Sequence, residues 1–182
     1  MTNERVYNQK IDKLRSPERV KLIEVDKVVE LSLEDIKPAN ILDVGTGSGL
    51  FAESFASKRL KVNGIDINSE MIEAVKEYVP NGEFVTAPAE SIPYPDKSFD
   101  LVFLGHVLHE TDNPLKAIRE AKRVTKKRIV ILEWPYVEEE AGPPLNHRIS
   151  LERISDLAYK AGLKNIETFQ LKHMVVVRID LL

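Results

Sequence analysis

Short apolar runs alternate with amphipathic stretches along most of the chain. Apolar runs bounded by glycine, proline or polar residues are typical of buried strands, whereas apolar residues three and four positions apart indicate a helix with one buried face. The alternation predicts a parallel sheet with helices packed on it. We expect strands over residues 40–44, 61–65, 83–86, 99–104, 128–133, 164–171 and 174–181.

Capping residues mark the helices between these strands. Asn113 and Pro114 suit the cap and the first position of a helix, and Gly162 suits the left-handed position that follows a helix end. Residues 134–147 contain four glycine or proline residues and are expected to form a loop. Helices are expected from Pro17 through Leu31, around residues 52–56, from the cap Ser69 to about Tyr78, from Pro114 to about Val124, and from Ser150 to Ala161.

The last two predicted strands lie so close in sequence that they must form an antiparallel hairpin. The earlier strands are separated by helices, which is typical of parallel pairing. The predicted fold class is therefore α/β, a doubly wound seven-stranded sheet that is mostly parallel, with the last strand antiparallel and helices on both faces. A chain of 182 residues corresponds to one domain, so we expect residues 1–182 to form a single unit.

The composition excludes several classes of function. The chain is 43% apolar and 30% charged, with a formal net charge of −3, which is typical of a globular protein and disfavours strong nucleic-acid binding. It has no cysteine, so disulfides, thiolate metal sites and a cysteine nucleophile are excluded. No apolar run approaches the roughly 20 residues that span a bilayer. Met1–Lys10 is polar, unlike an export signal, and we expect a cytoplasmic location.

A glycine-rich segment, Gly45–Gly49, follows the first predicted strand. Glycine permits positive φ and lets the backbone approach a ligand closely, and free amides at a helix start favour a polar or anionic group. The third glycine comes one position earlier than in the G-x-G-x-x-G pattern of dinucleotide folds. Asp66 lies 66 − 45 = 21 residues after the first glycine, where an acid can accept both ribose hydroxyls. These features predict a nucleotide-type cofactor site, with a tight turn that binds no ligand as the alternative.

Three segments in this order carry a family resemblance. Asp43–Gly49, Gly64–Asn68 with Met71, and Ala89–Asp100 resemble the motifs of class I S-adenosylmethionine-dependent methyltransferases, most of all the group that includes ubiquinone and menaquinone C-methyltransferases. The resemblance covers nearly the whole chain. It implies a Rossmann-like fold, S-adenosyl-L-methionine as cofactor and S-adenosyl-L-homocysteine as product. It also implies an amino-terminal lid and helix segment over residues 1–37 and a cofactor-binding core over residues 38–182.

The same resemblance assigns roles to individual residues. Asp66 would bind the ribose, Asp43 would lie near the amino group of the methionine part, and Ile67 would lie beside adenine. The family usually has an acid where this chain has Pro88, so adenine recognition would rely on the N–H of the following residue. The implied cofactor-binding residues are Asp43, Gly45, Thr46, Gly47, Gly49, Asp66, Ile67, Met71, Ala89, Glu90, Leu104 and Gly105.

Candidate catalytic residues are His109, Glu110 and His147. His109 and Glu110 follow the fourth strand, where ligands of such sheets bind, and could contact the acceptor or remove its proton. In the alternative interpretation His109 packs in the loop and Glu110 orders it. A third interpretation adds His106 and joins these residues in a zinc site. Because these side chains are few and have no fixed geometry, we expect no metal in the site.

The loop over residues 134–147 offers further candidates. Arg148 would suit an anionic acceptor, and Trp134 and Tyr136 form either an aromatic wall or core packing. Gly142–Pro144 is either part of the acceptor site or a rigid turn. Together with Leu14–Arg19, this region resembles a small bacterial and archaeal subgroup of the same methyltransferases.

The expected reaction is methyl transfer to a small-molecule acceptor by direct displacement, in which alignment supplies most of the rate. After the fourth strand the chain reads Leu104-Gly105-His106-Val107, which lacks the Asn/Asp-Pro-Pro-Tyr/Phe sequence resembling enzymes that methylate adenine or glutamine amino groups. One alternative is a quinone C-methyltransferase. Another is a non-catalytic S-adenosylmethionine-binding regulatory or partner module.

Overall fold

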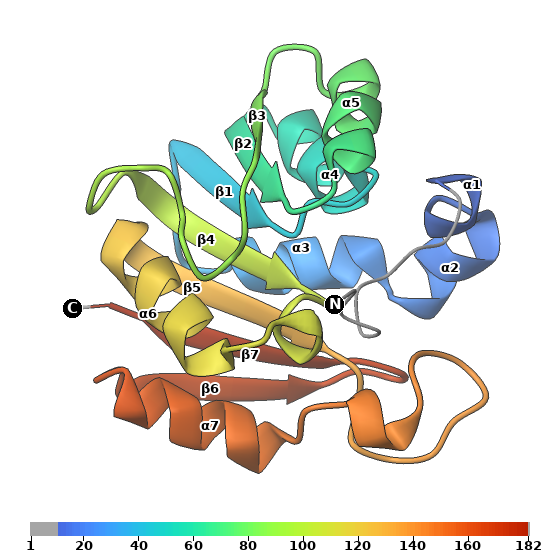
Figure 1. Cartoon of the computed structure of the whole chain (residues 1–182), viewed down its shortest axis with the longest axis vertical. Helices are drawn as coiled ribbons and strands as arrows, with labels where there is room; N and C mark the ends of the chain where they lie inside the picture. The colour runs from blue at the N-terminus through green and yellow to red at the C-terminus, as the bar shows by residue number, and fades with distance from the viewer. Residues whose placement is uncertain (1–10, 182) are drawn as a thin grey trace.

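A computed structural model describes residues 11–181, and Met1–Lys10, for which the sequence predicts a polar terminus, lies outside the described residues. Within the described part of the chain, seven strands form one sheet in the order β3-β2-β1-β4-β5-β7-β6 (Figure 1). β7 pairs antiparallel with both of its neighbours, and the other pairs are parallel. The predicted fold class is confirmed. The strands are β1 Asn40–Val44, β2 Lys61–Asp66, β3 Glu83–Thr86, β4 Phe99–Gly105, β5 Thr125–Glu133, β6 Asn165–Gln170 and β7 Val175–Asp180.

Helices cover both faces of this sheet (Figure 1). Because side chains alternate along a strand, neighbouring residues such as Leu101 and Val102 enter different cores. One core joins the sheet to α6 and α7, and the other joins it to α3, α4 and α5. The helices are α1 Ile11–Leu14, α2 Pro17–Leu22, α3 Val25–Leu33, α4 Leu50–Ser57, α5 Ser69–Tyr78, α6 Pro114–Val124 and α7 Leu151–Lys160, with 3-10 turns η1 Leu108–Glu110 and η2 Leu145–His147.

The strand order reverses at β1, which lies between β2 and β4. At such a switch point the loops that leave neighbouring strands diverge to opposite faces and open a crevice beyond the strand carboxyl ends. The glycine-rich loop leaves β1, and the turn η1 follows β4. The topology therefore brings the predicted cofactor loop and the predicted acceptor residues to the same edge of the sheet.

Several predicted boundaries are wrong. The helix expected from Pro17 through Leu31 is broken at Glu24, whose φ of 50° is left-handed. The carboxylate of Glu24 accepts a hydrogen bond from Lys172 N at 2.9 Å, which ties the break to the β6–β7 turn. The cap of α5 is Asn68, whose side chain accepts a hydrogen bond from Glu70 N, and not Ser69. In the described residues, no helix is long and apolar enough to cross a membrane.

Candidate functional site

The glycine loop leaves β1 with Gly45, Gly47 and Gly49 all at positive φ, 70°, 52° and 80°. A Cβ at Gly45 would lie 2.7 Å from the side chain of Val107, and one at Gly49 would overlap the side chain of Val75. These two glycines are therefore required by close packing. Gly47 differs, because a Cβ there would meet nothing nearer than a Leu14 methyl at 3.9 Å. The loop is thus less tightly packed at Gly47 than at Gly45 and Gly49, and the side chain that lies over it comes from the amino-terminal segment.

Two carboxyl groups flank this loop. Asp43, buried at the end of β1, accepts a hydrogen bond from Thr46 Oγ1 at 2.8 Å. Asp66, at the end of β2, accepts hydrogen bonds from the backbone N–H groups of Gly47 at 2.8 Å and Asn68 at 2.9 Å. The glycine loop is therefore held by hydrogen bonds to both acids, through Thr46 to Asp43 and through Gly47 to Asp66.

Burial governs the ionisation of both acids. It raises the pKa of Asp43 to about 7, opposed by the Thr46 hydrogen bond and assisted by the charge of Asp66. Burial also raises the pKa of Asp66, opposed by backbone N–H donors from Asn68 and Gly47. A ligand that carries a positive charge and hydroxyl groups would favour the ionised form of each acid, so the chemistry of the pair fits an aminoacyl nucleoside.

The segments predicted to lie beside adenine surround this pair. Ile67 is 59% exposed directly after Asp66, which leaves a large apolar side chain open to a flat ring, whereas Met71 and Ala89 are buried. The carboxylate of Glu90 accepts a hydrogen bond from Asn113 N at 3.3 Å and so links its segment to the start of α6.

Leu104 and Gly105 end β4 next to this loop. Leu104 is fully buried, and a Cβ at Gly105 would lie 2.6 Å from the ring of Phe103. Gly105 is therefore required by packing, with its backbone left at the sheet edge. The acids, the loosely packed glycine loop and the exposed apolar side chain fit S-adenosylmethionine, and each predicted cofactor contact stays a prediction.

The comparisons with known proteins agree with this geometry. The family model of the methyltransferase domain matches residues 42–131. A solved S-adenosylmethionine-dependent methyltransferase from Aquifex aeolicus is 29% identical, with a TM-score of 0.83 over 94% of this chain and 97% of its own. Demethylmenaquinone methyltransferase from Thermotoga maritima is 35% identical over 111 residues, 59% of this chain and 48% of that protein. An uncharacterised protein from Methanocaldococcus jannaschii is 28% identical over 76% of this chain and 71% of its own.

This chain belongs to the S-adenosylmethionine-dependent methyltransferases. The family resemblance predicted from the motifs is confirmed. The match to the Thermotoga enzyme spans about half of that protein's length. The quinone in the name of the Thermotoga enzyme is a statement about that enzyme and not about this chain.

The methyltransferase carries an amino-terminal segment directly against the glycine loop. Arg15 donates a hydrogen bond to Ser48 O at 2.9 Å, forms an ion pair with Glu53, and places its guanidinium 3.5 Å from the centre of the Tyr78 ring. The adjoining Leu14 lies over Gly47. Sequence reasoning missed Arg15 as a site residue, because its partners lie in the glycine loop, on α4 and on α5, and no local pattern indicates them.

On the acceptor side, a buried glutamate holds the turn after β4. Glu133, at the end of β5, accepts hydrogen bonds from His109 N at 3.2 Å and from the His109 ring, whose Nδ1 lies 2.7 Å away. Burial lowers the pKa of His109, but the charge and hydrogen bond of Glu133, with the charge of Glu110, outweigh it and raise the pKa overall. His109 Nε2 lies 3.9 Å from Glu110. His109 and Glu110 are therefore neighbours, and their catalytic role stays a prediction.

The expectation that Arg148 recognises an anionic acceptor is wrong. Its buried guanidinium donates hydrogen bonds to the carbonyls of Pro143 at 2.8 Å, Pro135 at 2.9 Å, Val137 at 2.9 Å and Ala141 at 2.6 Å. These four bonds use its planar donor set to fold the 134–147 loop around it. Sequence reasoning treated Arg148 as a surface cation, because nothing in the sequence shows that backbone carbonyls surround it.

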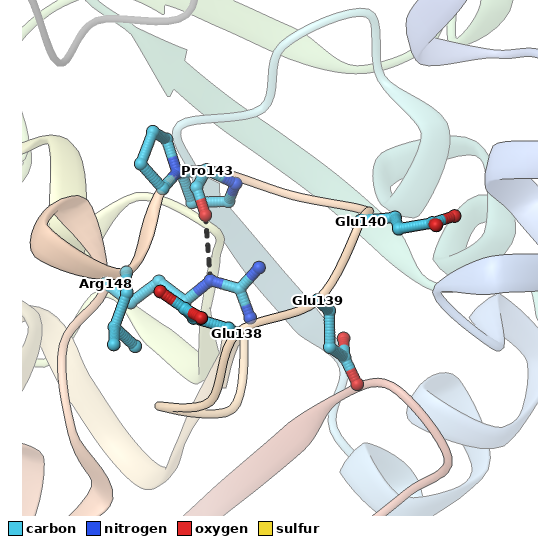
Figure 2. A pocket seen from close by; sticks show the side chains of 7 residues that line it. Glu138, Glu139, Glu140, Pro143 and Arg148 are labelled. Carbon is cyan, nitrogen blue, oxygen red and sulfur yellow. Dashed lines mark hydrogen bonds between the residues drawn. The ribbon is translucent and has the colours of Figure 1, made fainter.

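The same loop contains a cavity of about 480 Å³. Figure 2 shows Arg148 hydrogen-bonded to the Pro143 carbonyl beside Glu138, while Glu140 projects away from the guanidinium. His147 belongs to η2 at the end of this loop, and its proposed role stays a prediction. Across residues 11–181, no three histidine, aspartate or glutamate side chains are grouped to hold a metal ion, so the zinc interpretation has no support there.

Trp134 is packed under this loop. It is buried, and Gly142, at a φ of 88°, approaches it so closely that a Cβ would lie 2.7 Å from the indole. Of the two interpretations, core packing is therefore correct for Trp134, and Gly142 is required by that contact. Tyr136 is 52% exposed and remains available as an aromatic contact.

Proposed function

We propose that this methyltransferase transfers a methyl group from S-adenosyl-L-methionine to a small-molecule acceptor by direct displacement, releasing S-adenosyl-L-homocysteine. The observation that carries the proposal is the position of Asp43 and Asp66 on the two sides of a glycine loop that is loosely packed at Gly47. When bound, the cofactor supplies a methyl group already activated by a sulfonium. The protein then needs chiefly to bind, align and exclude water.

The residues divide these tasks between them. Asp66 would accept the ribose hydroxyls, because each carboxylate oxygen retains acceptor capacity beyond its one backbone hydrogen bond. Asp43 would balance the positive charge of the cofactor's amino acid part. Ile67, which is exposed, and Met71, which is buried, would both contact adenine. Backbone groups of Leu104 and Gly105 would complete the methionine end.

The acceptor would bind between the turn after β4 and the 134–147 loop, with His109, Glu110 and His147 as candidate contacts. The segment up to residue 37 would act as a lid on a core formed by residues 38–182. The contacts of Arg15 with Ser48 and Glu53 support this division, because they fasten the segment to the cofactor loop.

A quinone acceptor is the second candidate. The name of the Thermotoga relative favours it, and the partial coverage of that relative leaves it a proposal. A demethylated quinone added to a turnover assay, with product masses read by mass spectrometry, separates the two candidates.

Calorimetry tests the proposal most directly. The folded protein should bind S-adenosyl-L-methionine and S-adenosyl-L-homocysteine, and a turnover assay should release S-adenosyl-L-homocysteine when an acceptor is supplied. Failure of a folded sample to bind either compound at millimolar concentration would refute the proposal. Binding without turnover across a broad acceptor panel would instead favour a regulatory module.

A further inference from the structure

His106 occupies an unusual backbone position at the end of β4. Its φ of 57° is left-handed, a conformation that non-glycine residues rarely adopt. Its N–H donates a hydrogen bond to Leu132 O at 2.8 Å, so pairing with the neighbouring strand fixes this conformation. Strained residues held in this way occur preferentially at functional sites, where they present a side chain that a regular backbone would not.

The imidazole of His106 has unused hydrogen-bonding capacity. Both ring nitrogens are buried, and neither has a hydrogen-bond partner within residues 11–181. Buried polar atoms are nearly always paired in native proteins, so two unpaired nitrogens on one ring indicate a missing ligand or solvent partner. Burial, with the nearby charges of Arg19 and His109, holds the pKa of His106 well below its usual value. The ring is therefore neutral and offers one donor and one acceptor.

Packing fixes where the ring lies. It stacks against Trp134, with ring centres 5.1 Å apart and planes inclined by 38°. Trp134 is in turn held by Gly142 and by the guanidinium of Arg148, 5.7 Å from its ring. His106 also directly follows Gly105, a predicted cofactor contact. The rings of His106 and Trp134 thus lie beside the proposed methyl-transfer site, and the two nitrogens of His106 have no hydrogen-bond partner among residues 11–181.

We propose that His106 binds the acceptor through a hydroxyl group and takes the proton from that hydroxyl during transfer, so that the acceptor is a phenol or enol. This inference rests on the proposed methyltransferase function. The burial of the ring decides between acceptor classes. A protonated amine would bring a charge next to this buried ring, which is costly without an opposite charge, whereas a hydroxyl is neutral and can donate a hydrogen bond to the free nitrogen.

The chemical balance of the step is complete. The acceptor oxygen forms a bond to the methyl carbon while the carbon–sulfur bond breaks, and the electron pair of that bond remains on the sulfur as a neutral thioether. An oxygen that is gaining a methyl group becomes strongly acidic, so its proton can move to the unprotonated nitrogen of His106 although the pKa of that ring is lowered, and then to solvent. No oxidant, reductant or metal is required.

The test uses nuclear magnetic resonance of ¹⁵N-histidine-labelled protein, with catechol as the hydroxyl probe and 2-phenylethylamine as the amine probe. In the presence of S-adenosyl-L-homocysteine, catechol should shift the His106 ring nitrogens. The fluorescence of Trp134, the single tryptophan of the chain, should change in parallel. The amine should have little effect on either signal.

Variants separate binding from folding. His106→Phe keeps an aromatic ring and removes both nitrogens, and it should weaken catechol binding about tenfold or more, the loss of at least one buried hydrogen bond. His106→Gln restores a donor and an acceptor and should recover part of that affinity. His173→Phe is the matched control, because His173 contacts Glu139 in the loop and has no place in the proposed site. Each variant should bind S-adenosyl-L-homocysteine as the unmodified protein does.

The outcomes distinguish the two proposals. If S-adenosyl-L-homocysteine fails to bind, the methyltransferase function itself is refuted. If it binds while catechol leaves the His106 nitrogens unchanged, or while the amine shifts them more, the assignment of His106 to a hydroxyl acceptor is overturned and the methyltransferase function stands. Equal catechol affinity in His106→Phe and His173→Phe would also overturn it.

Discussion

The carboxylate of Asp66 accepts a hydrogen bond from the N–H of Gly47 at 2.8 Å, so the acid at the end of β2 and the glycine loop after β1 form one unit. The same carboxylate accepts from Asn68 N, the cap of α5. A ligand bound to Asp66 would therefore affect the hydrogen bonds that hold the glycine loop and the start of α5. These hydrogen bonds give Asp66 a structural role in addition to its proposed role in binding the ribose.

Asp66→Asn keeps the size of the side chain and one acceptor oxygen but removes the charge. Since hydrogen bonds to a charged group contribute about 1.5–3 kcal/mol, affinity for S-adenosyl-L-homocysteine should fall about tenfold or more. Calorimetry measures this loss. Glu70→Gln, a charge removal on the exposed start of α5, is the control and should leave affinity unchanged. Equal affinity in both variants would remove Asp66 from the cofactor site.

The glycines of the loop should respond differently to alanine. Gly49→Ala introduces both a strained φ and an overlap with Val75, whereas Gly47→Ala introduces the strained φ alone. A left-handed alanine costs about 1–2 kcal/mol, which lowers the melting temperature by about 2–4 °C per kcal/mol in a chain of this size. Gly49→Ala should melt several degrees lower still.

Cofactor affinity should differ in the opposite direction from melting temperature, with the larger loss in Gly47→Ala. Gly47→Ala, although more stable than Gly49→Ala, adds a methyl group on the loosely packed side of the loop and should weaken S-adenosyl-L-homocysteine binding at temperatures where both variants are folded. Thermal unfolding and calorimetry on the two proteins measure both effects. A Gly47→Ala variant that melts as low as Gly49→Ala would contradict the packing difference.

The raised pKa of Asp43 predicts a pH-dependent stability of the unliganded protein. The folded state holds the proton up to about pH 7, whereas an unfolded chain releases it near the ordinary value of 3.8. Between these values the unfolded state binds fewer protons, so the contribution of Asp43 to stability falls as pH rises from about 4 to 7 and is constant above. Asp43→Asn removes this dependence.

Urea unfolding at pH 4, 5.5, 7 and 8 tests this sign. Relative to the unmodified protein, Asp43→Asn should gain stability progressively toward pH 7 and keep the gain at pH 8. It should bind S-adenosyl-L-methionine more weakly at pH 8, because the balancing charge is gone. A stability difference that does not vary with pH would show that Asp43 ionises normally.

The link between Glu133 and His109 predicts a shift in histidine titration. Glu133→Gln retains a hydrogen-bond acceptor but removes the charge that keeps the pKa of His109 raised, so burial should prevail and the pKa should fall. Histidine resonances followed against pH measure this change. Glu138→Gln, an exposed charge removal in the nearby loop, should leave it unaltered. If the pKa of His109 is the same in Glu133→Gln as in the unmodified protein, Glu133 is not what raises it.

Local patterns in the sequence predicted most of the fold. β1, β3 and α6 have the predicted bounds, because apolar runs and capping residues specify such elements from neighbouring positions alone. The spacing of the motifs also predicted that Asp66 and the glycine loop belong to one site. The break at Glu24 was not predictable in this way, since its partner Lys172 lies far along the chain.

The acceptor side was less predictable for the same reason. The environment of Arg148 depends on the path of a loop, and a sequence pattern does not distinguish a guanidinium that binds a ligand from one that binds four carbonyls. The sequence placed His106 in the segment near the acceptor and indicated no specific role for it beyond that of a metal ligand. Its unpaired nitrogens become visible once the positions of Trp134 and β5 are known.

Arg148 therefore gives a prediction about the loop that it organises. Arg148→Lys keeps the positive charge, but an ammonium has three donors in place of a planar set and cannot satisfy four carbonyls from one position. Carbonyls left unpaired in a partly buried loop cost about 1–3 kcal/mol, so the melting temperature should fall by about 2–4 °C per kcal/mol lost. Limited proteolysis should become faster between Tyr136 and Ala141, where the loop would open. Arg153→Lys, on the exposed face of α7, is the matched control and should change neither measurement. Identical proteolysis of the two variants would show that the loop is held by contacts other than those of Arg148.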